Sequence, residues 1–140
     1  MRRRYLFIYI ALLMLTGQVA MAQNNAMRQV YTQADEEYKV GRIDEALTLL
    51  KTNIDNFQGG LKQSAFRLMA LCSLGQDNTE EAEAYVGLLL KEAPYFSPSA
   101  QDPARFVDMV NKFKLGQTAT ITTASSHAET LEEVYHSIYG

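Results

Sequence analysis

The sequence predicts an all-α protein in which antiparallel helical hairpins follow a cleavable N-terminal signal and precede a flexible tail. Apolar residues recur with helical spacing in successive segments between residues 27 and 113. Gly and Pro separate these segments at short intervals, and no stretch before residue 117 alternates with period two. The chain has 140 residues, 47% of them hydrophobic, which is enough for one compact domain.

The N-terminal segment is typical of a secretory signal. Arg2–Arg4 precede an unbroken apolar run of 11 residues, Tyr5–Leu15, and Ala20–Ala22 matches a signal peptidase site. We therefore predict that residues 1–22 are a signal and that cleavage leaves Gln23 as the first residue. A retained membrane anchor is the alternative, but it needs a run of about 20 apolar residues. No Cys lies near the cut, which excludes a lipid-modified N-terminus.

The charge balance excludes two classes of partner. Cleavage changes the formal charge from -3 to -6, because residues 1–22 contain three Arg and no acid. Nucleic acids and anionic lipids both favour clustered Lys and Arg, which the acidic mature chain lacks. We therefore expect an exported, periplasmic protein with no nucleic-acid partner. Its mature form should have no membrane span, and association with the outer membrane is left open.

The first hairpin is predicted from two apolar faces that are separated by Gly41. The first helix carries Met27, Val30, Tyr31, Ala34 and Tyr38. Gly41 is expected to end this helix, because Gly accepts the left-handed conformation. The second helix carries Ile43, Ala46, Leu47, Leu50, Ile54 and Phe57. The connection is so short that the two helices must be antiparallel neighbours.

A second hairpin follows the break at Gln58–Gly60. Its first helix, from Leu61 to Leu74, is apolar almost all round, which indicates a central helix that is buried on several sides. Asn78 and Glu81 have the spacing of a capping box at the start of the next helix. That helix should end before Pro94, because the residue before a proline is disfavoured in helical geometry.

A loop and a fifth helix complete the predicted fold. We expect Tyr95 and Phe96, at the start of the loop, to fold back onto the preceding hairpin. Asp102 is suited to cap the fifth helix and Pro103 to occupy its first position. The helix is predicted to continue to Gly116.

The pattern of small residues and Pro94 in these hairpins resembles tetratricopeptide repeats (TPR), which are helix-turn-helix units of about 34 residues. The match is partial, because the corresponding Ala46 and Ala82 are 36 positions apart and the first unit lacks the closing proline. The resemblance implies about two repeats and a capping helix over residues 23–116. Such a stack would have a shallow concave side suited to a peptide or another protein.

The composition changes in residues 117–140, where small polar residues replace the helical faces. Thr120, Ile121, Thr122, Thr123, Ala124 and Ser125 form a linker, or a segment that becomes a strand only when it is paired. Together with the signal, the helical domain, the run Asp102–Val110 and the run Leu131–Val134, this segment resembles the N-terminal part of a TonB-dependent outer-membrane receptor of the Bacteroidetes type.

The receptor resemblance implies a non-enzymatic periplasmic interaction domain, with TonB or a component of an outer-membrane receptor as its partner. The segment Thr120–Ser125 would be the part that TonB grips through strand addition, although an ordinary solvated linker fits the composition equally well. The plug and barrel of such receptors are absent after Val134, so the expectation is a truncated receptor that cannot transport alone. The alternative is a stand-alone periplasmic TPR adaptor.

No residue pattern indicates catalysis, a cofactor or a metal. His127 and His136 flank Glu129, Glu132 and Glu133, but no third fixed ligand is apparent. Cys72 is expected to be a small core residue, since no His lies in the helical domain to act as its base. Gly59 and Gly60 lack the Lys and Ser/Thr of a phosphate loop and are interpreted as a turn. Four aromatic residues are expected to be core or hairpin contacts first and ligand-stacking groups second: Tyr31, Tyr38, Tyr85 and Phe66.

Overall fold

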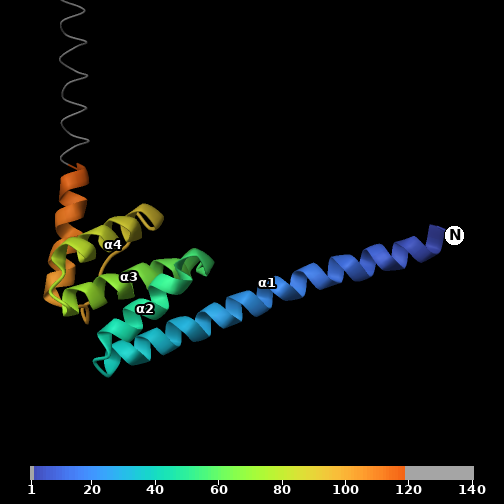
Figure 1. The fold of residues 1–140 in the computed structure, drawn as a ribbon. Helices are drawn as coiled ribbons and strands as arrows, with labels where there is room; N and C mark the ends of the chain where they lie inside the picture. Colours follow the sequence, from blue (N-terminus) through green and yellow to red (C-terminus); the bar gives the residue numbers. More distant parts are fainter. Residues whose placement is uncertain (1, 119–140) are drawn as a thin grey trace, which may run out of the picture. The chain divides into compact units, whose positions relative to one another are not determined.

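The computed structural model describes residues 2–118, and within them the side chains of residues 3–11 and 21–118. All regular elements in this range are helices and no described residue lies in a strand, as the periodicity predicts. The elements are α1 (Arg2–Lys39), α2 (Ile43–Asn53), the 3-10 helix η1 (Ile54–Asn56), α3 (Gly59–Gly75) and α4 (Thr79–Glu92). A further helix at residues 104–118 follows (Figure 1).

The chain divides into two compact units, one that ends at Tyr85 and one that begins at Val86. The boundary lies within α4, so its first residues belong to the N-terminal unit and its last to the C-terminal unit. In the N-terminal unit, α1 packs against α2 and α3, and α2 packs against α3.

Helix α1 is longer than the first helix that the sequence predicts. It begins at Arg2 instead of near Met27 and continues through Ala22 and Gln23 without a break. No Pro lies between its ends, and the Leu, Ala and Met residues of its first half favour a helix. Residues 5–10 are 48–72% exposed, and this part of α1 extends beyond α2 and α3 (Figure 1). Within the described residues, no helix combines the length and apolarity that a membrane crossing needs.

The turn between α1 and α2 confirms the predicted role of Gly41. Gly41 has a φ of +85°, in the left-handed region. Its N–H donates to the Tyr38 carbonyl at 3.0 Å, and the Arg42 N–H donates to the Glu37 carbonyl at 2.9 Å. These two bonds form a Schellman motif, which satisfies carbonyls that the end of α1 would otherwise leave unpaired.

The second helix is shorter than its apolar face predicts. Ala46, Leu47 and Leu50 are buried as expected, but α2 ends at Asn53 and the chain tightens into η1. Phe57 is extended, with φ −75° and ψ 138°, and is buried outside any helix. Gln58 follows this buried residue, and α3 begins at Gly59.

Helix α3 is the buried centre of the N-terminal unit, as predicted. Residues 65, 66 and 68–74 are all buried, including Cys72 and Ser73. The predicted break at Gln58–Gly60 is partly wrong, because only Gln58 is extended. Gly59 and Gly60 form the first turn of α3.

The connection between α3 and α4 confirms the predicted capping box. The Asn78 side-chain oxygen accepts a hydrogen bond from the Glu81 N–H at 3.2 Å, and the Asn78 amide donates to the Glu81 carboxylate at 3.1 Å. Asp77 precedes the cap with a φ of +56°. The Asn78 N–H donates back to the Ser73 carbonyl at 2.9 Å, which closes the end of α3.

In the C-terminal unit, one of the predicted loop features differs from the structure. Tyr95 is 97% exposed and does not fold back onto the hairpin, while the Phe96 ring contacts Phe106 edge-on with a centroid separation of 6.2 Å. The Asp102 carboxylate accepts a hydrogen bond from the Ser99 N–H at 2.7 Å and thereby closes the loop.

The last described helix also differs from its prediction at both ends. It begins at residue 104, one position after Pro103, and it continues through Gly116 to residue 118. The Thr118 side-chain hydroxyl donates to the Lys114 carbonyl at 3.0 Å within this last turn. Phe106, Met109 and Val110 provide its buried face.

Candidate functional site

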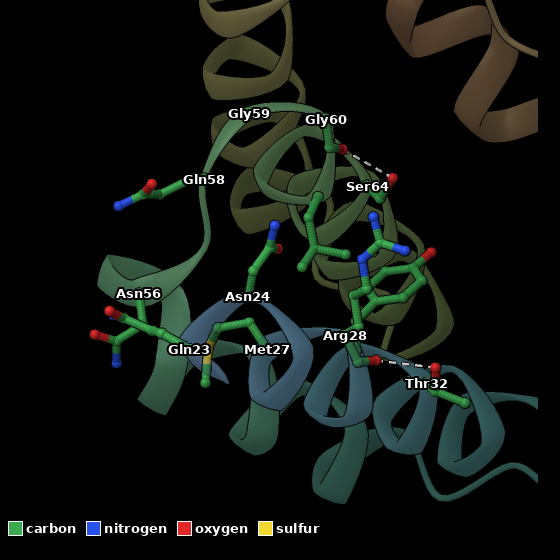
Figure 2. A pocket seen from close by; sticks show the side chains of 12 residues that line it. Gln23, Asn24, Met27, Arg28, Thr32, Asn56, Gln58, Gly59, Gly60 and Ser64 are labelled. Carbon is green, nitrogen blue, oxygen red and sulfur yellow. Dashed lines mark hydrogen bonds between the residues drawn. The ribbon is translucent and has the colours of Figure 1, made fainter. Parts of the chain in front are cut away.

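A cavity of about 1000 Å³ in the N-terminal unit lies between α1 and the corner where η1 leads into α3 (Figure 2). Its residues come from two stretches that lie far apart in the sequence. Helix α1 contributes Gln23, Asn24, Met27, Arg28, Tyr31 and Thr32. The corner and the first turns of α3 contribute Asn56, Gln58, Gly59, Gly60, Leu61 and Ser64.

The local fold explains why the cavity forms at this place. Helix α2 ends after 11 residues and η1 turns the chain, so the start of α3 stands away from α1. Phe57 is buried and anchors the corner. Gly59 has a φ of +57°, which residues other than Gly rarely adopt, and it begins α3 directly after the extended Gln58.

The hydroxyl groups of Thr32 and Ser64 are already bonded within their own helices. The Thr32 hydroxyl donates to the Arg28 carbonyl at 2.9 Å, and the Ser64 hydroxyl donates to the Gly60 carbonyl at 3.0 Å (Figure 2). Such bonds to the fourth residue back satisfy the hydroxyl locally. These two groups therefore contribute little to the recognition of a ligand.

The side-chain amides of the cavity, unlike these two hydroxyls, are not hydrogen-bonded to described residues. The side chains of Gln23, Asn24, Asn56 and Gln58 make no hydrogen bond to another described residue. Each primary amide offers one acceptor oxygen and two N–H donors. The cavity thus has four such amides, two on α1 and two at the corner, all available to a ligand.

Among the described residues that line the cavity, Arg28 alone has an ionised side chain, and none is Asp or Glu. Its exposed guanidinium makes no ion pair with a described residue. Tyr31 lies three positions further along α1, on the same side of the helix. Burial, followed by the negative charge of Asp35, raises the pKa of the Tyr31 hydroxyl above its usual 10.0, so this group is a neutral donor near pH 7.

A second, more open hollow of about 470 Å³ lies between α1 and α2. Two of the three acids that line it are already engaged: Glu37 accepts a hydrogen bond from Arg42, and Asp44 accepts one from Gln76. The hydrogen bond from Arg42 lowers the pKa of Glu37. Nothing in this hollow indicates catalysis, and no group of three or more His, Cys, Asp or Glu side chains in the described part of the chain could hold a metal ion.

The structure describes only some of the candidate residues that were predicted from the sequence. The candidate coupling segment Thr120–Ser125 lies outside the described residues, as do His127 and His136. Cys72 is fully buried, and burial raises the pKa of its thiol to about 12, which suits a core residue and not a nucleophile.

The four aromatic residues that were predicted as core or hairpin contacts have different surroundings. Phe66 is buried, and Tyr38 is half-buried. Tyr85 is half-buried and its hydroxyl donates to Glu81 at 3.1 Å. Tyr31 lines the cavity, so it is the one of these four that a ligand there would meet.

The four amides of the cavity and Arg28 were not predicted from the sequence as binding residues. They flank the predicted apolar face of α1 and the predicted break, where polar residues are ordinarily only solvated. Comparison with known proteins adds no further constraint, since no family model, curated protein or solved structure matches the chain.

Proposed function

We propose that this chain is an exported, non-enzymatic protein-interaction domain built from TPR-like helical hairpins. The observation that carries the proposal is the cavity beside α1, where four amides and Arg28 form no hydrogen bond or ion pair with the side chains that the structure describes. A surface that binds another polypeptide needs donors and acceptors of this kind. The all-helical fold and the central position of α3 are compatible with hairpin repeats.

The proposed biological context is the periplasm, in the role of the N-terminal domain of a TonB-dependent receptor. The support is the order of parts in the sequence, from the signal to the run Leu131–Val134. In this proposal the helical domain docks a protein partner and Thr120–Ser125 act as the coupling segment. TonB and a component of an outer-membrane receptor are the expected partners.

Photo-crosslinking in living cells tests the docking role. A photoreactive residue at Gln58 of the full chain should form a crosslink to a partner protein, whereas the same residue at the exposed Lys91 should not. The additional change Gly60→Val should abolish the crosslink, because an added Cβ at Gly60 meets no atom within 4 Å and a larger side chain would occupy the cavity. Equal crosslinking from Gln58 and Lys91 would contradict the proposal.

The coupling segment is tested separately with the purified periplasmic domain of TonB. A chain that stops after residue 118 retains the whole described helix at residues 104–118. It should lose binding to TonB while its thermal unfolding is unchanged. If binding persists without residues 119–140, the coupling role is wrong. If a partner protein is nevertheless crosslinked at Gln58, that result would favour the alternative function, a stand-alone periplasmic TPR adaptor.

A further inference from the structure

The cavity beside α1 has a lining that distinguishes between kinds of polypeptide. Gln23 and Asn24 lie on α1, and Asn56 and Gln58 lie at the corner before α3 (Figure 2). A helical ligand uses its backbone N–H and C=O groups internally. An extended segment presents both groups along its length, and primary amides can pair with each of them. The lining therefore favours an extended segment over a helix.

Backbone access at the corner supports the same conclusion. Gly59 and Gly60 have no atom within 4 Å of an added Cβ. Both residues also line the cavity. A ligand backbone can approach the protein here more closely than any side chain would allow.

The charge of the lining adds a requirement for the ligand's side chains. Arg28 is a lone cation with no acid in the lining and no ion pair in the described residues. A guanidinium presents a planar set of donors that fits a carboxylate with two parallel hydrogen bonds. The Tyr31 hydroxyl is instead influenced by the charges of Asp35, Arg67 and Lys39, so we assign the carboxylate contact to Arg28 alone.

We infer that the cavity beside α1 binds an extended peptide segment that carries an Asp or Glu side chain. The ligand backbone pairs with the four amides, and its carboxylate pairs with Arg28. This inference rests on the proposed docking function, and it specifies the chemistry of the segment that is docked. The predicted cleavage after Ala22 would leave Gln23 and Asn24 on the chain. It would also add the α-amino group of Gln23 to the lining, so the role of Arg28 is tested in the uncleaved full chain.

A selection from random short peptides tests the inference. The full chain is immobilised, and the peptides are acetylated and amidated so that only side chains carry a carboxylate. Peptides with Asp or Glu should be enriched about tenfold over their Asn or Gln counterparts, which is the effect of one charge-assisted contact. Arg28→Gln should remove this preference, and the charge-matched control Lys91→Gln should retain it.

A second pair of variants tests the backbone contacts. Gln58→Ala should weaken binding of every enriched peptide, whereas Gln63→Ala, which changes an amide on α3 outside the cavity, should not. Gly60→Val should block all binding. Enrichment of neutral or basic peptides, or an acidic preference that survives Arg28→Gln, would overturn the inference. In either case the crosslink at Gln58 could still form, so failure of the inference is distinct from failure of the proposed function.

Discussion

The Glu81 carboxylate joins three helices of the N-terminal unit. It accepts hydrogen bonds from Lys51 on α2, from the Ser73 hydroxyl on α3 at 3.4 Å and from the Tyr85 hydroxyl on α4 at 3.1 Å. The hydrogen bond from Lys51 is the main cause that lowers the pKa of Glu81 below its usual 4.5. The ionised form of Glu81 is therefore favoured by folding.

Glu81→Gln should destabilise the protein by about 0.5–1.5 kcal/mol at pH 7, the usual net contribution of one hydrogen-bonded group. Because folding lowers this pKa, the contribution is complete above pH 4.5 and disappears as the pH falls through the folded-state pKa. Urea unfolding at pH 7 and pH 3 measures the difference. The control Glu80→Gln removes an exposed acid from the same first turn, and an equal loss of stability in both variants would contradict the assigned role.

Leu68 tests the central position of α3 at the level of one side chain. It is 1% exposed, so Leu68→Ala should lower the free energy of unfolding by about 2–5 kcal/mol through lost burial and the resulting cavity. Leu88, on α4, is 41% exposed, and Leu88→Ala should change stability by no more than about 0.5 kcal/mol. Thermal and urea unfolding of both variants measure the contrast. Similar losses would show that burial at Leu68 is not what stabilises the unit.

At the level of helices, the helix ends that were predicted best from the sequence are those fixed by interactions between neighbouring residues. Gly41 and the Asn78–Glu81 pair act through neighbours within a few residues, so their spacing alone identifies them. The end of α2 was not predicted, because Ile54 and Phe57 continue the helical spacing while tertiary burial of Phe57 requires an extended backbone. Gly116 is likewise a poor stop signal, since a helix tolerates Gly at a modest cost.

The turn after α1 provides a prediction about Gly41. Gly41→Ala should destabilise the protein by about 1–2 kcal/mol, because Ala is disfavoured in the left-handed conformation that the Schellman motif requires. Gly75→Ala is the matched control. Its added Cβ would lie at an ordinary 3.6 Å from Ile43 Cδ1, and its backbone is helical, so this change should be neutral or stabilising by up to about 1 kcal/mol. Circular dichroism melts compare the two, and a cost at Gly75 equal to that at Gly41 would refute the explanation.

At the level of the whole molecule, the candidate site was harder to predict than the fold. The helical faces recur with a fixed period, whereas the cavity brings together Gln23 and Gln58, which are 35 positions apart. Polar residues at a helix flank and in a break carry no periodic signal. Only the three-dimensional course of η1 and α3 distinguishes these amides from solvated ones.

The predicted signal also has a consequence for the folded chain. Residues 5–10 are exposed, and among the side chains that the structure describes the first buried apolar one is that of Ala34. Within the described side chains, loss of residues 1–22 therefore removes no buried apolar group. Mass spectrometry of the exported protein should find Gln23 as the first residue, and a chain of residues 23–140 should unfold within about 0.5 kcal/mol of the full chain, as for changes at surface positions. An exported protein that retains Arg2–Arg4 would refute cleavage. A large loss of stability on removal of residues 1–22 would instead mean that the first half of α1 packs against the rest of the protein.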